Sequence, residues 1–168
     1  AKAYHPGQGV YRSSYQNAIR MTRTVINTAY RESDYIRWQQ FDFVVGIDIK
    51  TSKSHATWLA KYWYPRFKKG RAPLEICDRM EGRYPKTFKF IGWHPNCRCY
   101  AVPILANEGT NKDWWEKPEN EVKDMPSGYN DWLNENEDRI LDAAKRGKLP
   151  YWIKENKKYV NILQKQGG

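Results

Sequence analysis

The feature that most constrains this chain is a helical pattern from Val10 to Gln40 that neither proline nor glycine interrupts. Apolar and small side chains recur in it at spacings of three and four residues, which is the period of one face of an α-helix. These side chains are Tyr15, Ala18, Ile19, Thr22, Val25, Ile26, Ala29 and Tyr30. We therefore predict one long N-terminal helix, which we expect to pack on a small sheet.

The expected sheet follows the helix directly. Residues 41–50 alternate in character, and Phe43, Val45, Ile47 and Ile49 share one face, as in a half-buried strand. A short helix over 74–84, ended by Gly82, then precedes the rest of the sheet, which we assign to about 86–92 and to 97–105. The predicted fold class is α+β, with an antiparallel sheet.

The last third of the chain has a different pattern. Residues 107–125 are polar and rich in turn-forming residues, after which Ser127 is a candidate N-cap, Gly147 a candidate helix stop and Pro150 the start of a last helix. We divide the chain into a linker at 1–9, a domain at 10–106 and a helical C-terminal extension at 107–168. No apolar run approaches the ~20 residues that a membrane span needs, so we expect no membrane partner.

Positive charge is concentrated in the first two-thirds of the chain. The formal net charge is +10, and residues 1–106 carry 18 basic and 7 acidic side chains. Such a bias indicates a polyanion or an acidic partner, although it equally suits a soluble surface. Between 51 and 73 the basic residues are interleaved with aromatic ones, a pattern typical of nucleic-acid contact and equally of an arm that docks on another subunit. The candidate DNA-binding residues are Lys61, Arg66, Lys68, Lys69 and Arg71, with Arg12, Arg20 and Arg23 on the long helix.

Three cysteines do not form the framework of a secreted disulfide protein, which indicates a reducing compartment. In a strand, Cys97 and Cys99 project to the same face. With His94 on the preceding turn, and Cys77 or His55 as a further ligand, they can close a tetrahedral zinc site of the Cys₃His or Cys₂His₂ type. Two alternatives remain open: small buried hydrophobic thiols with His94 capping the turn, and a disulfide from Cys77 to Cys97 or Cys99.

Arg98 lies between these cysteines and would project to the opposite face. A guanidinium on a rigid strand can bind a carboxylate or a phosphate with two parallel hydrogen bonds. The alternative, which we favour, is a salt bridge to Asp42, Asp48 or Glu75 that pins the sheet.

Several sequence motifs, taken in order, resemble the phage Mu F-like minor head (head-morphogenesis) protein family. They are the Arg23-Thr24 pair in the long helix, the strand FVVGIDIK, His55, ICDRMEGRYP at 76–85 and GWHPNCRCYAVPIL at 92–105. The tail from 125 to 156 resembles an extension in head proteins of phages from gut Bacteroidetes. The chain departs from the family where Val25 replaces an acidic residue after Arg-Thr, and where a single cysteine stands at Cys77, so a four-cysteine metal site is not available.

The resemblance implies a minor capsid protein that acts in head assembly, in the host cytoplasm and then in the virion. Its expected partners are the portal or other capsid proteins, and DNA. The alternative is a metal-independent nuclease or toxin-like effector domain, in which His55 or His94 would be the general acid or base and Arg98 would stabilise the phosphate. No carboxylate cluster suits a two-metal nuclease, and no GxxxxGK[ST] loop is present, so the structural role is the leading hypothesis.

Overall fold

A computed structural model describes residues 13–66, 74–107 and 118–164 of the chain. The predicted linker at 1–9 lies outside these residues, as do Arg12, Lys68, Lys69 and Arg71. Within them the fold is α+β, as predicted. It has a long N-terminal helix, a three-stranded antiparallel sheet and a helical C-terminal region.

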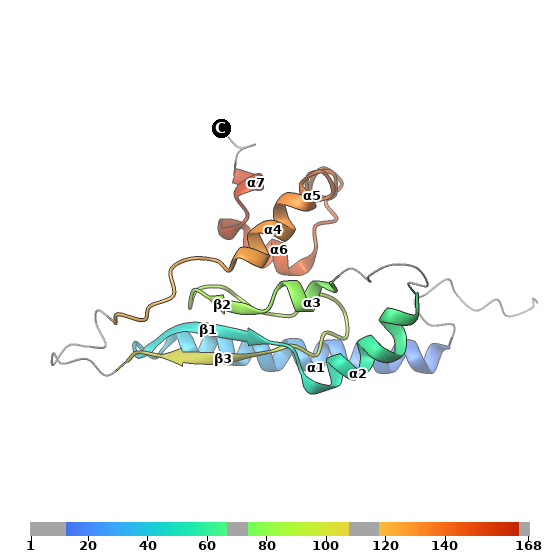
Figure 1. Cartoon of the computed structure of the whole chain (residues 1–168), viewed down its shortest axis with the longest axis horizontal. Helices are drawn as coiled ribbons and strands as arrows, with labels where there is room; N and C mark the ends of the chain where they lie inside the picture. Colours follow the sequence, from blue (N-terminus) through green and yellow to red (C-terminus); the bar gives the residue numbers. More distant parts are fainter. Residues whose placement is uncertain (1–12, 67–73, 108–117, 165–168) are drawn as a thin grey trace, which may run out of the picture.

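The long helix is α1, Ser14–Gln39. Ser13 caps its N-terminus, since the side-chain oxygen accepts a hydrogen bond from the Gln16 backbone N–H at 3.4 Å. The helix ends where the predicted pattern ends, at Gln40. Figure 1 shows α1 running lengthwise past the sheet, on the side away from the C-terminal helices.

The sheet has the strand order β2-β1-β3, with β1 at Val44–Lys50, β2 at Gly82–Tyr84 and β3 at Tyr100–Leu105. β1 pairs antiparallel with both neighbours; Ile47 lies opposite Tyr84 on one side and Pro103 on the other. Figure 1 shows the three strands side by side. Pro103 lies on β3, an edge strand of this sheet, where a residue without an N–H donor is tolerated.

Two predicted elements of the sheet region were wrong. The helix expected over 74–84 is shorter, because α3 covers only Ile76–Arg79 and Gly82, at φ 145°, begins β2 instead. The segment 86–92 is not a strand. Pro85 cannot donate to a ladder, so the pairing with β1 stops at Tyr84 and the following aromatic side chains turn into the core.

The predicted burial of β1 is correct at its centre and wrong at its start. Phe43 lies before the strand and is 43% exposed, whereas Val44 and Val45 are both buried. At this end of β1, which β2 does not reach, the chain near Val122 lies beside the strand and donates its backbone N–H to the carbonyl of Val45 at 3.1 Å. Gly46 leaves the space for the Val122 side chain: an added Cβ would lie 2.6 Å from its Cγ2.

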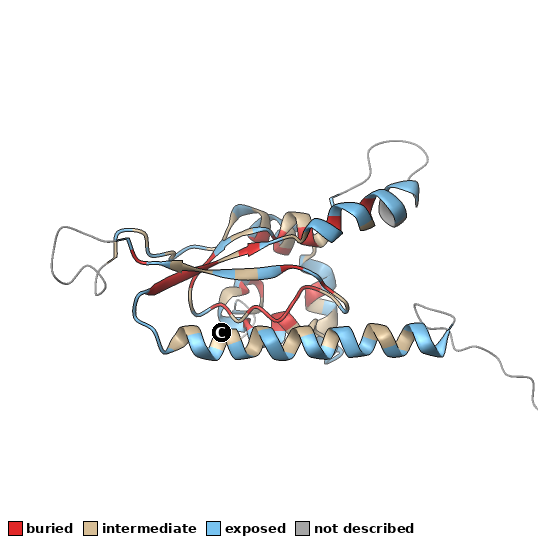
Figure 2. Cartoon of the chain, turned by 90° about the horizontal axis from the view of Figure 1, so that it is seen from below, coloured by how far each residue is buried: buried red, intermediate tan, exposed pale blue. Residues whose placement is uncertain are grey.

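A short helical arm follows β1. It consists of α2, Lys53–Trp58, a π-helical turn η1, Leu59–Trp63, and a 3-10 turn η2, Tyr64–Arg66. His55 and Leu59 are the buried residues among those of the arm whose burial is described. The arm projects from the body (Figure 2), and Lys53, Ser54, Ala56, Thr57 and Tyr64 are among its exposed residues.

The C-terminal region contains α4, Ser127–Glu135, α5, Glu137–Lys145, α6, Tyr151–Glu155, η3, Lys157–Tyr159, and α7, Asn161–Gln164. Ser127 is the first helical residue rather than the N-cap, a position that Pro126 occupies. Gly147, at φ 66°, follows α5 in the left-handed conformation expected of a helix stop. Pro150 begins α6 as its N-cap, but the predicted last helix is broken at Asn156 and Val160.

One hydrophobic core joins the sheet region to these helices. Its centre is an aromatic cluster in which ring centroids lie between 4.6 and 6.0 Å apart. The cluster consists of Tyr84, Phe88, Trp93, Tyr129 and Trp152, all buried. Such pairs add to the free energy of burial through favourable edge-to-face contacts.

The long helix contributes none of its residues to the fully buried set. Several of its apolar side chains face outward instead: Tyr15, Val25 and Ile26 are 68%, 57% and 49% exposed. Figure 2 shows exposed residues along the length of this helix. None of the helices in the described parts of the chain has both the length and the apolar character that a membrane crossing requires.

Candidate metal centre

Cys77, His94 and Cys97 form a compact group beneath the HPNCRC turn. The Cys77 sulfur lies 3.9 Å from the Cys97 sulfur and 3.1 Å from His94 Nε2. All three ligand atoms are within 4.8 Å of one another. In a tetrahedral zinc site with Zn–S bonds of about 2.3 Å, two sulfur ligands lie about 3.8 Å apart, so the two thiols are already spaced as ligands.

The local fold of each segment explains the grouping. Cys77 is held at the start of α3, where the Glu75 carboxylate caps the helix by accepting its backbone N–H at 2.8 Å. The turn is closed by a hydrogen bond from the Cys97 N–H to the His94 carbonyl at 3.1 Å. Asn96 takes the left-handed conformation that this turn needs, at φ 61°. The structure thus brings together Cys77 and Cys97, two of the candidate zinc ligands of the sequence analysis.

The orientation of His94 suits a ligand. Its Nδ1 is 2.9 Å from the Pro95 carbonyl oxygen. A carbonyl only accepts, so Nδ1 carries the proton in this hydrogen bond and Nε2, the atom that faces Cys77, is left with its lone pair. Fixing the tautomer through the second ring nitrogen is the arrangement that metal-bound histidines use.

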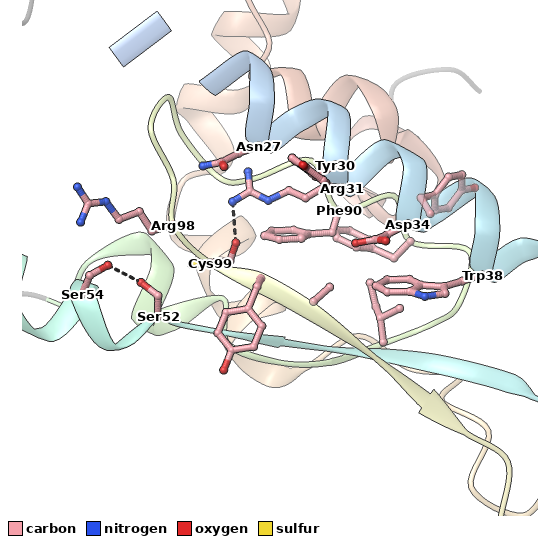
Figure 3. Close-up of a pocket in the computed structure, with 15 residues that line it drawn as sticks. Asn27, Tyr30, Arg31, Asp34, Trp38, Ser52, Ser54, Phe90, Arg98 and Cys99 are labelled. Carbon is pink, nitrogen blue, oxygen red and sulfur yellow. Dashed lines mark hydrogen bonds between the residues drawn. The ribbon is translucent and has the colours of Figure 1, made fainter. Parts of the chain in front are cut away.

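The inner face of α1 fastens the turn to the body. Arg31 donates to the carbonyls of Ile91, Cys97 and Cys99 at 3.2, 2.8 and 2.6 Å, and its guanidinium lies 5.0 Å from the Phe90 ring centroid. Figure 3 shows Arg31 reaching from the helix to Cys99. Thr24 adds an anchor, because its hydroxyl oxygen accepts the Asn96 N–H at 2.8 Å. These contacts hold the HPNCRC turn against α1 and so fix the positions of its candidate ligands.

The three thiols influence one another's ionisation. The pKa of Cys97 lies well below its usual range, because the thiols of Cys77 and then Cys99 stabilise its charged form. The pKa of Cys77 is raised, first by its hydrogen bond to Cys97, then by Cys99 and by burial. For Cys99, the hydrogen bond to Cys77 lowers the pKa, but the hydrogen bond to Cys97 and burial together raise it by more, so its pKa is also raised. A bound cation would favour the deprotonated form of the thiols that it contacts.

Cys99 and His55 lie next to the group of Cys77, His94 and Cys97 but are not members of it. Cys99 is buried and all three cysteines are free, so the predicted alternative of a disulfide is wrong for this structure. The prediction that Cys97 and Cys99 lie within a strand is also wrong, because β3 begins at Tyr100. His55 forms a second group with Glu75 and Cys77, and its Nε2 is 2.9 Å from Asp78.

Glu75 is the residue that the sequence did not identify as a ligand. It is buried, and its carboxylate lies between the two histidines, 3.6 Å from His94 Nε2 and 4.0 Å from His55 Nε2. The only sequence signal is its position two residues before Cys77, at the start of a short helix. A carboxylate at this position is expected to cap the helix, and the Glu75 carboxylate does so.

Arg98 is not part of this group. It is exposed and forms no ion pair with Asp42, Asp48 or Glu75, so the favoured salt bridge was wrong. The backbone points Cys97 and Cys99 inward and Arg98 outward, where it borders a cavity of about 430 Å³ between α1 and β3. Figure 3 shows its side chain directed away from Arg31, toward the arm at Ser52 and Ser54.

The described candidate DNA-binding residues are dispersed. Arg23 is exposed on α1 and Arg20 is half-buried there, while Lys61 is exposed on the arm, which ends at Arg66. Comparison of the chain with protein-family models, with curated proteins and with solved structures gives no match.

Proposed function

We propose that the chain is a minor capsid protein of phage head assembly, whose fold is locked by a structural zinc ion at Cys77, His94 and Cys97. The observation that supports the zinc site is the convergence of three buried or half-buried ligand atoms from α3 and the HPNCRC turn within 4.8 Å. Sulfur and imidazole nitrogen are the ligands that zinc prefers. Cys99 or Glu75 would complete the tetrahedron.

The surroundings of the group favour a structural ion over a catalytic one. Cys77 and Cys97 are 2% and 1% exposed, and the turn carrying His94 is held by backbone and side-chain hydrogen bonds on several sides. Structural zinc sites use four protein ligands and leave no open position for a substrate. A fold clamped in this way suits an assembly component, as the family resemblance implies.

The metal content of the purified chain tests the zinc proposal. We expect one zinc ion per chain by elemental analysis, with loss of the ion in Cys77→Ser and Cys97→Ser. His55→Gln separates the two candidate groups: retention of zinc assigns the ion to Cys77, His94 and Cys97, whereas loss of zinc assigns it to the group of His55, Glu75 and Cys77. Cys99→Ser and Glu75→Gln then identify the fourth ligand. If wild-type protein is refolded in the presence of zinc and still contains no zinc, the proposed site is wrong.

The assembly role is tested separately in purified phage heads. We expect the chain to be a stoichiometric head component, cross-linked to portal or shell protein, and heads made without it to be defective. Its absence from purified heads would refute the role whatever the zinc content.

We also propose that the basic arm meets packaged DNA through Lys61 and Arg66, with Lys68, Lys69 and Arg71 beyond the described part and Arg12, Arg20 and Arg23 on the helix. Binding of this kind weakens steeply with salt because counterions are released. Reversing three of the arm charges should flatten that salt dependence. Cleavage of DNA or RNA in the same assay, with and without chelator, would instead favour the nuclease alternative with His55, His94 and Arg98.

A further inference from the structure

The outer face of α1 is an apolar stripe that no described element covers. Its members follow one another at alternating spacings of three and four residues, apart from one place taken by Glu32. They are Tyr15, Ala18, Thr22, Val25, Ala29 and Ile36. Tyr15, Val25 and Ile36 are 68%, 57% and 55% exposed, and the bordering Met21 is 69% exposed. Figure 2 shows the exposed face along the length of the helix.

The helix meets its own body through the opposite side, which is largely polar. Thr24, Asn27 and Arg31 bond the HPNCRC turn, and Trp38 packs on the core. Their spacings of three, four and seven residues place them on one side of the helix. One helix thus carries two stripes: the inner one is used within the chain, and the outer one leaves apolar area in water. Contiguous exposed apolar patches of this kind mark interaction sites.

The spacing of the outer stripe indicates what packs on it. Apolar residues at alternating three and four are the heptad pattern by which one helix packs lengthwise against another. Small side chains at Ala18, Thr22 and Ala29 let the second backbone approach closely. A flat sheet or an extended peptide would not use this register.

The charges beside the stripe indicate which helix packs against it. Flanking charges normally set partner choice in helix pairs and repel the wrong partner. Here the flanking positions carry none: they are Ile19, Met21, Ile26, Thr28, Ser33 and Tyr35. The single charge within the stripe, Glu32, is paired with Lys89 at 2.6 Å, and the same ammonium group also bonds Glu155 at 3.0 Å. A second copy of the same surface therefore meets no like charges at the flanking positions, which suits a self-complementary two-fold contact.

We propose that α1 is a dimerisation helix, whose outer stripe packs against the same stripe of a second copy of the chain. This inference goes beyond the head-assembly proposal and does not depend on zinc. The two bodies, each with net charge +10, would lie on the far sides of the helix pair. At physiological ionic strength charges more than about 8 Å apart are largely screened, so the apolar contact is not opposed over long range.

Sedimentation equilibrium of the full chain at physiological ionic strength tests the proposal. We expect wild-type protein to populate a dimer as concentration rises. Val25→Glu places two carboxylates in the desolvated stripe and should raise the dimer dissociation constant by at least about tenfold, equivalent to about 1.4 kcal/mol. Tyr30→Glu is the matched control: Tyr30 is 71% exposed on the same helix and receives the same charge, but lies outside the stripe, so dimerisation should persist.

Helix content, thermal midpoint and zinc content should match wild type in both variants, since both side chains are exposed. If Val25→Glu fails to fold, Val25→Asn replaces it. A chain that stays monomeric up to its solubility limit would overturn the proposal. Equal loss of association in both variants would overturn it as well, because the contact would then lie elsewhere.

Discussion

Cys97 is the residue on which the zinc proposal depends most directly. Its sulfur is 3.9 Å from that of Cys77, and its backbone carbonyl accepts from Arg31 and Asn27. We expect Cys97→Ser to lower the thermal midpoint strongly when zinc is present, since a ligand at a thousandfold excess over its dissociation constant stabilises the folded state by about 4 kcal/mol. With chelator present, the free energies of unfolding of wild type and Cys97→Ser should differ by only about 1–3 kcal/mol, which is the cost of a buried hydroxyl without a partner. Chelator that leaves the wild-type midpoint unchanged would contradict the prediction.

The raised pKa values of Cys77 and Cys99 give zinc binding a definite pH dependence. Zinc binds thiolates, so binding has to displace the proton that Cys77 retains in the metal-free cluster. At pH values below the raised pKa, the apparent affinity for zinc increases about tenfold per pH unit for each proton that zinc has to displace. We therefore expect zinc affinity to increase with pH around neutrality, measured by competition with a chelator whose own protonation is known. An affinity that stays constant across this range would mean that the ligands are already ionised without metal.

At the scale of elements, the close contact between β1 and the returning chain at Val122 can be tested by substitution. Gly46→Ala would place Cβ 2.6 Å from Val122 Cγ2 and 3.1 Å from the Tyr84 carbonyl oxygen. Overpacking of this kind costs about 1–3 kcal/mol in the free energy of unfolding. Val122→Ala in the same chain should recover part of the loss, with a coupling energy of about 1 kcal/mol in urea unfolding. Additive effects of the two substitutions would show that the strand shifts away from Val122 instead.

The same elements show what the sequence could and could not predict. The period of α1 and the alternation of β1 were readable, because long regular elements repeat their pattern many times. The side of α1 that meets the body could not be predicted, since Thr24 accepts a hydrogen bond from, and Arg31 donates hydrogen bonds to, a turn about 70 residues away. β2 has three residues and begins with Gly82, too short for any pattern. The cysteine and histidine positions indicated a metal site by their chemistry, whereas the buried place of Glu75 depends on the tertiary fold.

At the scale of the whole molecule, the C-terminal helices share one core with the sheet region. Asn156 is the polar link between the two. It is 1% exposed; its amide group donates to the carbonyls of Lys89 and Trp152 at 2.9 and 2.8 Å, and its oxygen accepts the Lys89 N–H at 2.8 Å. This bond pattern imitates a strand pairing and holds the segment that leads to the aromatic cluster and the HPNCRC turn.

We predict that Asn156→Ala destabilises the entire described fold and not the C-terminal helices alone. The substitution removes the hydrogen bonds to the half-buried N–H and carbonyl of Lys89 and the buried one to the Trp152 carbonyl, at about 1–3 kcal/mol for each group left without a partner. Because the aromatic cluster spans both regions, unfolding should remain one transition, with tryptophan fluorescence and far-ultraviolet circular dichroism giving the same midpoint. Asn134→Ala, at an exposed asparagine of α4, is the control and should leave the free energy of unfolding within about 0.5 kcal/mol of wild type. Two separated transitions in Asn156→Ala, with zinc retained through the first, would show that the C-terminal helices fold independently of the metal centre.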